Sequence, residues 1–167
     1  MTTHSMLRWL WLSAVVIVLD QATKYLASGL LDYGVPVPVL PFFNLTLAHN
    51  PGAAFSFLAE ASGWQRWFFI GIALVVSVLI VGWMKRLSPR ENWLAAALAL
   101  ILGGAIGNVI DRVMYGYVVD FIDLYYGAWH WPAFNIADSA ITVGVAIMLI
   151  DSLLFSRETT PGAVGKE

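Results

Sequence analysis

Residues 67–84 read WFFIGIALVVSVLIVGWM, a run of eighteen positions without a charged side chain. About 20 apolar residues in a helix cross the hydrocarbon core of a bilayer, within a range of about 17–25. A backbone in lipid must also satisfy its own hydrogen bonds, which a helix does within one segment. The run therefore predicts a transmembrane helix.

Three more long apolar segments lie at about residues 7–30, 93–110 and 136–155, and of these only 93–110 is also free of charged side chains. The chain has 167 residues, of which 59% are hydrophobic and 12% charged. Ordinary soluble domains carry about 25% charged residues. We therefore predict an all-α membrane protein, a single domain over residues 1–167 with four transmembrane helices and a disordered tail at about 157–167.

Composition also excludes several classes of protein. A net charge of −2 and the lack of a basic run argue against a nucleic-acid partner. The chain has no cysteine, which rules out disulfides, thiolate nucleophiles and cysteine metal sites. A cleavable signal peptide ending near residues 27–29 is a second interpretation of the first apolar run. Asp20 interrupts that run, however, and the run then continues beyond the usual length of a signal peptide.

The distribution of lysine and arginine predicts the orientation in the membrane. The short connection between the second and third helices carries Lys85, Arg86 and Arg90, whereas the other two connections carry only Arg66 and Arg112, both at helix ends. The positive-inside rule then places both termini and the short connection in the cytoplasm. Residues 31–65 and 111–135 are expected to face outward.

The first outward segment is expected to hold short extended structure. Prolines between Val35 and Pro41 favour an extended chain, and the alternation at 42–47 predicts a short strand. Residues 50–52, Asn-Pro-Gly, indicate a turn, and the apolar residues 53–58 could lie along the membrane surface.

The predicted topology gathers polar residues from distant parts of the chain at the outward membrane face. An ionisable group in the bilayer costs roughly 2.5–3.5 kcal/mol on insertion scales, so each such group is a candidate functional residue. The helices bring Asp20, Lys24, Asn108, Asp111, Arg112, Asn135 and Asp138 to this face, and the outward segments add Asn50 and Asp120.

Several of these residues also have a purely structural interpretation. Asp20 and Lys24 are four positions apart on one helical face and could simply pair with each other. Asn135 could cap the fourth helix, and Asp138 is favoured in its first turn by the helix dipole.

The outward end of the third helix has a similar alternative. Asp111 and Arg112 could be a solvated helix end at the membrane interface, and Asp123 is expected to be exposed to water. The glycines at 103 and 107 predict close helix packing more than a binding loop.

Carboxylate chemistry is what the remaining motifs favour. The chain has no His-Glu-x-x-His run and no Gly-x-Ser-x-Gly elbow, so no metal site is predicted. A serine–lysine pair, with Lys24 as base and Ser56 or Ser139 as nucleophile, stays open without support from spacing. Two close carboxylates do not both ionise easily, so one keeps a proton while the other activates a water. Asp120 and Asp138 are the candidate pair.

Five motifs occur in order from the first helix to the fourth: Leu19-Asp20-Gln21-x-x-Lys24, Asn50-Pro51-Gly52-Ala53-Ala54-Phe55, Gly103-Gly104-Ala105-x-Gly107-Asn108-x-x-Asp111-Arg112, Val118-Val119-Asp120-Phe121 and Phe134-Asn135-x-Ala137-Asp138. Together they resemble the bacterial lipoprotein signal peptidase family, the type II signal peptidases. The resemblance covers nearly the whole chain.

The resemblance implies an aspartic endopeptidase of the bacterial inner membrane without metal or cofactor. It implies that the enzyme removes signal peptides from prolipoproteins by cutting before a cysteine that carries a diacylglyceryl group. Asp120 and Asp138 would be the catalytic dyad. Supporting or substrate-binding roles are implied for Asp20, Lys24, Asn50, Gly52, Asn108, Asp111, Arg112, Asn135 and Ala137.

Further expectations concern the outward surface and the partners. The resemblance implies a small extracytoplasmic β-cradle and an amphipathic flap in the first outward segment, and it implies inhibition by the cyclic peptide globomycin. The expected partners are lipid-modified prolipoproteins and membrane lipid, and nothing in the sequence requires more than a monomer. Two alternatives are a small proton-coupled transporter subunit and a structural subunit. The first conflicts with polar groups confined to one face, and the second leaves those groups unexplained.

Overall fold

The computed structural model describes residues 5–52 and 63–155. Four helices in these residues are long and apolar enough to cross a membrane, which confirms the prediction of four spans. They are α1 (Leu10–Leu30), α2 (Trp64–Met84), α3 (Asn92–Met114) and α4 (Ile136–Phe155), and a short 3-10 helix, η1 (Met6–Trp9), precedes α1. The expected flap at 53–58 and the expected disordered tail lie outside the described residues.

Two helices are longer than the apolar runs that predicted them. α2 begins at Trp64, three residues before the predicted start, and α3 continues to Met114, past the predicted end at residue 110. The additional turn of α3 contains Asp111 and Arg112. The apolar run ends before the first charged residue, Asp111. The backbone stays helical beyond it because the side chains of Asp111 and Arg112 bond to other groups of the protein.

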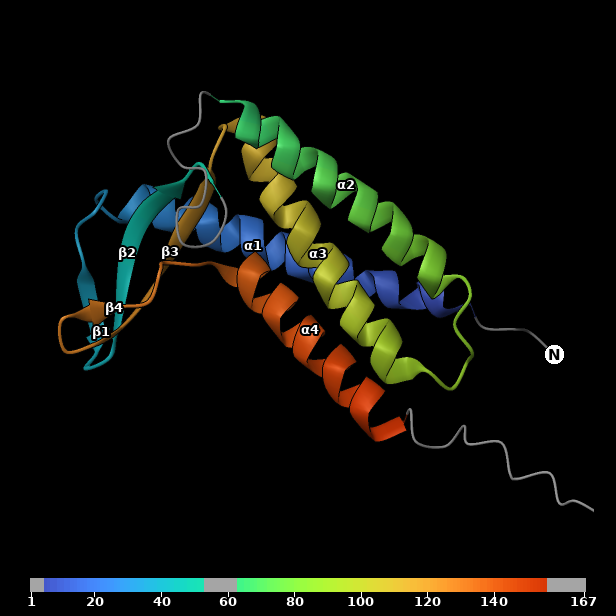
Figure 1. The fold of residues 1–167 in the computed structure, drawn as a ribbon. Helices are drawn as coiled ribbons and strands as arrows, with labels where there is room; N and C mark the ends of the chain where they lie inside the picture. Colours follow the sequence, from blue (N-terminus) through green and yellow to red (C-terminus); the bar gives the residue numbers. More distant parts are fainter. Residues whose placement is uncertain (1–4, 53–62, 156–167) are drawn as a thin grey trace, which may run out of the picture.

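α3 is the central helix of the bundle, and a larger share of its span is buried than of the other three spans. Figure 1 shows α3 with neighbouring helices on both sides. Its glycines permit this packing, since a Cβ on Gly103 would lie 2.8 Å from Val16 Cβ of α1. A Cβ on Gly104 would collide with the carbonyl oxygen of Ala137 in α4. The predicted role of these glycines in close helix packing is therefore confirmed.

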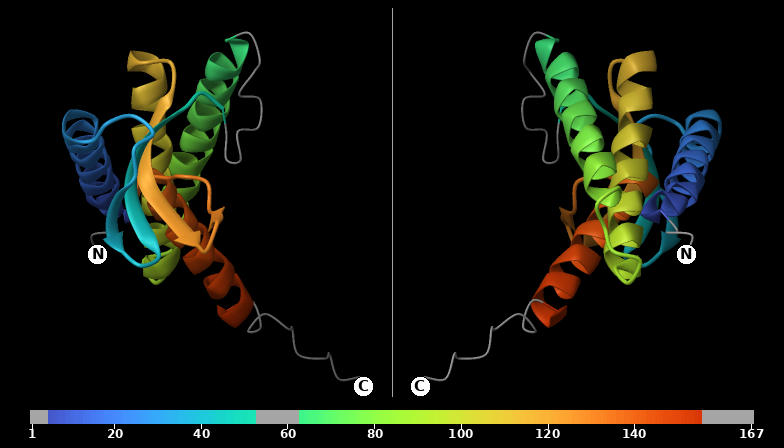
Figure 2. Two further views of the ribbon diagram at one scale, coloured as in Figure 1. Left: turned by 90° about the vertical axis from the view of Figure 1, so that its left-hand side faces the viewer. Right: turned by 90° about the vertical axis from the view of Figure 1, so that its right-hand side faces the viewer.

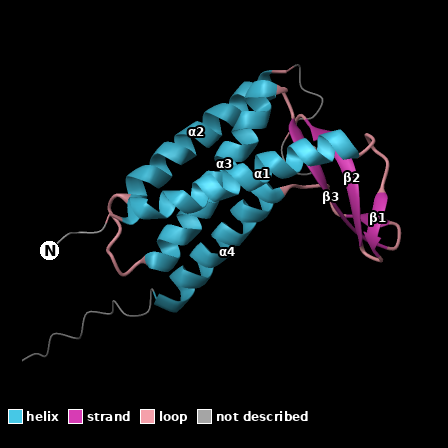
Figure 3. Cartoon of the chain, turned by 180° about the vertical axis from the view of Figure 1, so that it is seen from behind, coloured by secondary structure: helices cyan, strands magenta, loops and turns pink. Residues whose placement is uncertain are grey.

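A small antiparallel sheet lies at one end of the bundle, as the family resemblance implied. Its strands are β1 (Val37–Leu40), β2 (Phe43–Asn50), β3 (Val118–Tyr126) and β4 (Trp129–His130), in that spatial order. Viewed from the sheet, β2 and β3 lie across the ends of the helices (Figure 2). The start of α1 and the end of α4 lie at the opposite end of the bundle (Figure 3).

β3 is the element that the sequence analysis did not predict. Residues 111–135 were expected only to face outward, and nine of them form the strand that pairs with β2. The run is rich in valine, isoleucine and aromatic residues, which favour strands. Asp123 was expected to be exposed to water, yet both aspartates of this strand are buried.

Candidate active site

A cavity of about 780 Å³ opens where the sheet meets the helix ends. Its walls come from β2, β3, the segment 131–134, α3 and the first turns of α4. Asp120 and Asp138 both line it, as do Asn50, Asn108 and Arg112. The rest of the lining is largely apolar and includes Leu124, Trp131, Phe134, Ile141 and Val143. The fold thus brings the two predicted catalytic aspartates, which lie on different elements, to one space.

Asp120 is held in β3 opposite Ala48 of β2, and only 2% of its surface is exposed. Asn135 Nδ2 donates to its Oδ1 at 2.7 Å, and Asn50 Nδ2 donates to its Oδ2 at 3.2 Å. Burial, followed by the negative charge of Asp138, raises the pKa of Asp120 to about 7, against the lowering effect of the two amide donors. At neutral pH, the Asp120 carboxyl is therefore protonated in a large fraction of the molecules.

Asp138 lies in the first turn of α4 and is partly exposed to the cavity. Its Oδ1 accepts a hydrogen bond from Asn108 Nδ2 of α3 at 2.7 Å. The expected favourable position near the helix N-terminus is confirmed, because negative charge there interacts well with the helix dipole.

Asn135 performs two tasks that the sequence analysis had treated as alternatives. Its Oδ1 accepts the backbone N–H of Asp138 at 2.9 Å, which is the predicted N-cap of α4. That bond points its Nδ2 at Asp120, and the same Nδ2 lies 3.2 Å from Asn108 Oδ1. A chain of hydrogen bonds therefore runs from Asp120 through Asn135 and Asn108 to Asp138.

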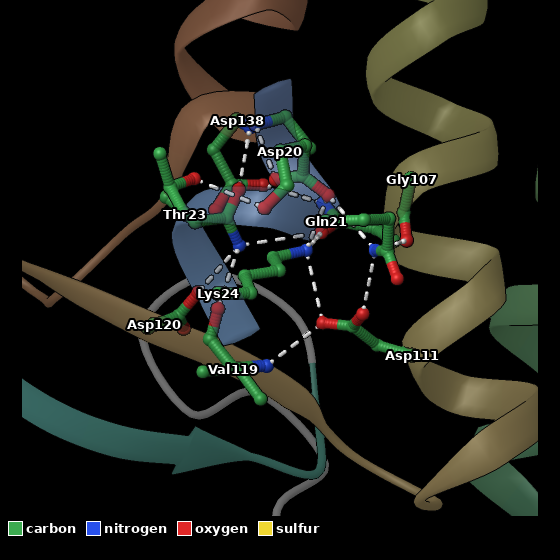
Figure 4. Close-up of polar contacts among 12 residues, drawn as sticks. Asp20, Gln21, Thr23, Lys24, Gly107, Asp111, Val119, Asp120 and Asp138 are labelled. Atoms are coloured by element: carbon green, nitrogen blue, oxygen red, sulfur yellow. Dashed lines mark hydrogen bonds and ion pairs between the residues drawn. The ribbon is translucent and has the colours of Figure 1, made fainter. Parts of the chain in front are cut away.

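Lys24 is the centre of a second cluster, which touches this chain at Asn108 (Figure 4). Its Nζ lies 2.8 Å from Asp20 Oδ2, 2.9 Å from Asp111 Oδ2 and 2.9 Å from Asn108 Oδ1. The predicted pairing of Asp20 with Lys24 is therefore confirmed.

The expectation of a solvated helix end is wrong for Asp111, which is 1% exposed. The charge of Asp111, which lies on α3, is compensated by Lys24 of α1. The cluster also argues against a serine–lysine mechanism. Lys24 directs its ammonium at three acceptors, and the Ser139 hydroxyl donates to the carbonyl of Asn135 at 2.9 Å. Ser56 lies outside the described residues.

Arg112 connects the end of α3 to the turn that follows β2. Its Nη2 donates to the Gly52 carbonyl at 2.8 Å, and its guanidinium lies 5.2 Å from the centre of the Phe69 ring. The Gly52 N–H in turn donates to Asn50 Oδ1 at 3.0 Å, which is the predicted turn. Asn50 thus donates to Asp120 on one side and fixes this turn on the other.

Two residues near the site were not among the predicted site residues. Gln21 Nε2 donates to Asp111 Oδ1 at 2.9 Å and lies 3.2 Å from both Asp20 Oδ2 and the Gly107 carbonyl. His49 lines the cavity, stacks on Tyr117 at 4.0 Å, and has its pKa lowered by burial. Gln21 is a position of the first of the five motifs, which was the available signal, but its uncharged amide was not counted among the candidate site residues.

Asp123 corrects a further expectation, because it is 6% exposed and not solvated. Its carboxylate accepts from Asn44 Nδ2 at 3.1 Å and Thr46 Oγ1 at 3.2 Å, and it lies 2.7 Å from His130 Nδ1. Burial disfavours its charge, but the hydrogen bonds from His130, Asn44 and Thr46 outweigh burial and hold its pKa below the ordinary value. Asp123 ties β2, β3 and β4 together and does not line the cavity described above.

The chemistry available here is acid–base chemistry by two carboxylates. Within residues 5–52 and 63–155, no group of three His, Cys, Asp or Glu side chains could hold a metal ion. A protonated carboxyl and an ionised carboxylate at one cavity can donate and accept a proton in the same reaction. The arrangement suits the attack of a water molecule on a carbonyl carbon.

Comparison with known proteins gives a consistent result. Residues 12–154 match the family model described as signal peptidase (SPase) II. The lipoprotein signal peptidase of Acinetobacter baumannii is 58% identical over 150 residues, 90% of this chain and 85% of the relative. The lipoprotein signal peptidase of Vibrio parahaemolyticus is 51% identical over 162 residues, 96% of this chain and 95% of the relative.

Two solved structures share the architecture. A bacterial membrane enzyme determined by the in meso method at 2.3 Å resolution superposes with a TM-score of 0.82 at 33% identity, over 95% of this chain and 94% of that chain. A second, determined by the same method at 1.9 Å resolution, gives a TM-score of 0.76 at 34% identity, over 91% of this chain and 94% of that chain.

Proposed function

This chain belongs to the signal peptidase II family, and from that membership we propose that Asp120 and Asp138 are the catalytic residues with which it cleaves prolipoprotein signal peptides. The observation that carries the assignment is the hydrogen-bonded chain that joins the two carboxylates through Asn135 and Asn108 at one cavity. Signal peptidase II is an aspartic peptidase of a multi-pass membrane protein fold, and four spanning helices and a carboxylate pair agree with that chemistry.

The two aspartates take different roles in the proposed reaction. Asp138, which accepts one amide donor and faces the cavity, removes a proton from the attacking water. Asp120, with a pKa raised to about 7, donates its proton toward the oxygen of the scissile carbonyl. As the tetrahedral intermediate collapses, the proton on Asp138 passes to the leaving amine, and the carbonyl oxygen returns its proton to Asp120. General acid–base catalysis of this kind contributes about 10²–10⁴-fold.

We propose that the active site lies at the outer face of the bacterial inner membrane, with both termini in the cytoplasm. The connection between α2 and α3, which carries Lys85, Arg86 and Arg90, lies at the end of the bundle opposite the sheet (Figure 1), and the positive-inside rule assigns that end to the cytoplasm. The sheet end, with its cavity, then lies at the outward membrane surface. A lipid-modified precursor would have its cleavage site at this depth, since its acyl chains hold it there.

The apolar part of the cavity supports a lipidated substrate. Ile141 and Val143 of α4 extend the lining away from Asp138, along a helix that is largely open to lipid. We propose that this surface receives the diacylglyceryl group of the substrate cysteine and restricts the geometry of the scissile bond. We also propose that the protein acts as a monomer in contact with membrane lipid. We propose that globomycin inhibits it.

Cleavage of a lipidated prolipoprotein by purified variants tests the assignment. Asp120→Asn and Asp138→Asn are each expected to lower kcat at least about 100-fold, since each removes one partner of the acid–base pair. Asp32→Asn, which changes an exposed carboxylate after α1, is the control and should keep the parental rate. Parental cleavage by Asp120→Asn or Asp138→Asn would refute the dyad.

A further inference from the structure

One buried carboxylate holds the backbone beside Asp120. Asp111 Oδ2 accepts the backbone N–H of Val119 at 3.0 Å, and Val119 directly precedes Asp120. Both Asp111 and Val119 are buried, so no solvent competes for this bond. The position of β3 at Asp120 is therefore tied to a side chain on α3.

A second buried carboxylate holds the backbone beside Asp138 in the same way. Asp20 Oδ1 accepts the backbone N–H of Ala137 at 2.9 Å, and Ala137 directly precedes Asp138. This N–H is one of the first donors of α4, which have no acceptor within their own helix. Asp20 and Asp111, the support carboxylates, thus each fix the backbone next to one catalytic aspartate.

The support carboxylates are joined to each other by two side chains of α1. Lys24 Nζ lies 2.8 Å from Asp20 and 2.9 Å from Asp111. Gln21 Nε2 lies 3.2 Å from Asp20 Oδ2 and 2.9 Å from Asp111 Oδ1, with the Gly107 carbonyl at 3.2 Å as a third acceptor. Figure 4 shows Lys24 and Gln21 bridging the carboxylates. Lys24 supplies the opposite charge, and Gln21 supplies a neutral second bridge.

The bridge leaves no spare room around Asp20. A Cβ added to Gly107 would lie 2.6 Å from Asp20 Oδ2. Only glycine at this position lets the carboxylate sit against α3, close enough to share the Gln21 amide with Asp111. The separation of the two support carboxylates is therefore defined by packing as well as by hydrogen bonds.

We propose that Gln21 is a positioning residue of the peptidase, which together with Lys24 sets the separation of the support carboxylates and, through their backbone bonds, the separation of Asp120 and Asp138. The inference rests on the proposed function, since it requires these two aspartates to react as a pair. Separation matters because the mutual repulsion of two carboxylates decides how far apart their two ionisation steps lie. A misplacement of about 1 Å at a reacting centre can also cost about 100-fold in rate.

Gln21 is the informative position because its replacement by methionine leaves the charges around the pair unchanged. The charged or titratable groups near the catalytic pair are Asp20 and Lys24 on α1, Asp111 and Arg112 on α3, and His49 on β2. All five are retained in Gln21→Met. A change in the pH dependence of this variant therefore reports the geometry of the pair.

The experiment measures kcat and KM for a lipidated prolipoprotein between pH 5 and pH 9. Gln21→Met is expected to lower kcat about 10- to 100-fold with little change in KM, because the substrate cavity keeps its lining. Its active pH range should also narrow, since carboxylates that move apart repel less and their two ionisation steps approach each other. Thr23→Val is the matched control on α1, since the Thr23 hydroxyl bonds only carbonyls of its own helix.

Gln21→Glu provides a second, shape-conserving variant. The ionised side chain of this variant places a third carboxylate against Asp20 and Asp111, so its loss of kcat at pH 8 should exceed that of Gln21→Met. Activity relative to the parent should recover as the pH falls, because the introduced carboxyl can donate a hydrogen bond again once it is protonated. This recovery decides the question if Gln21→Met does not fold.

Three results would overturn the inference: a parental kcat in Gln21→Met, a lower kcat with a parental pH range, or a loss in Gln21→Glu that does not respond to pH. The second result would mean that Gln21 only keeps the protein folded, which thermal unfolding of each variant measures separately. Asp120→Asn in the same assay separates this inference from the proposed function. If Asp120→Asn is inactive while Gln21→Met is parental, only the positioning role fails.

Discussion

Two pairs of aspartates lie next to each other at the sheet end of the bundle, and they differ in what balances their charge. Asp20 and Asp111 share the Lys24 ammonium, and both side chains are almost fully buried. Among the described residues, the side-chain donors to Asp120 and Asp138 are neutral amides only. Amides orient a carboxylate without supplying a positive charge, so the second pair has to keep a proton.

This difference assigns structure to one pair and chemistry to the other. A carboxylate that shares a buried ammonium has its charge balanced and serves as a fixed acceptor, here for the backbone N–H groups of Val119 and Ala137. A carboxylate among amides can gain or lose a proton near neutral pH, as the raised pKa of Asp120 indicates. The same residue type therefore has two roles, which its neighbours decide.

The largest expected effect comes from removing the shared ammonium. Lys24→Met would leave Asp20 and Asp111 buried beside each other without a compensating charge. Breaking a buried ion pair in this way costs about 3–5 kcal/mol. We expect the free energy of unfolding in detergent to fall by about that amount, as measured by denaturant titration.

Lys85→Met is the matched control, since Lys85 is exposed at the opposite end of the bundle. It should unfold as the parent does. If Lys24→Met were as stable as the parent, the support carboxylates would have to be neutralised by another route, and the contrast between the two pairs would disappear.

The comparison also shows what could be predicted from sequence. The four spans follow from long apolar runs, because lipid requires a continuous helix. The meeting of Asp120, Asn50, Asn108 and Asp138 follows from topology, because the polar groups cluster at the outward ends of the predicted spans. The pairing of Asp20 with Lys24 follows from their spacing on one helix.

Other features depend on partners that lie far apart in the sequence. The burial of Asp111 requires Lys24 on another helix, and the burial of Asp123 requires Asn44 and Thr46 on another strand. Local sequence around both aspartates resembles solvated ends and loops. β3 was not predicted either, because two aspartates interrupt its run of strand-forming residues. Asn135 carried a clear capping signal, but its bond to Asp120 depends on the fold.

A smaller effect is expected from changing an amide of the reacting pair. Asn50 donates to Asp120 Oδ2, and this bond lowers the pKa of Asp120 against burial and the charge of Asp138. As the proposed acid, Asp120 must be protonated, so parental activity should fall as the pH rises through about 7. Asn50→Leu removes a donor to the ionised form, so the pKa rises and the alkaline limb of kcat should move upward by about one pH unit.

Asn92→Leu is the control, because Asn92 accepts from Arg8 at the far end of the bundle and should leave the pH profile unchanged. An alkaline limb that moves downward in Asn50→Leu, or stays in place, would show that Asp120 is not the acid. The roles of Asp120 and Asp138 would then be reversed, while the contrast with the support carboxylates would remain.

The smallest effect is expected at a fifth aspartate, which is paired with a partly exposed side chain outside the cavity. His130 is 49% exposed and lies 2.7 Å from Asp123. Exposed ion pairs contribute about 0–1 kcal/mol, so His130→Ala should lower the free energy of unfolding by no more than that and should leave prolipoprotein cleavage near the parental rate.

The pH dependence of the His130→Ala effect has a definite sign. The pKa of Asp123 is lowered in the folded protein, so its stabilising contribution is present above its unfolded pKa of about 3.9 and is lost as the pH falls through the folded value. The stability difference between parent and His130→Ala should therefore shrink below about pH 4, as measured by denaturant titration at several pH values. A loss of cleavage in His130→Ala would instead connect this pair to the active site and would place all five of these buried or partly buried aspartates in one functional network.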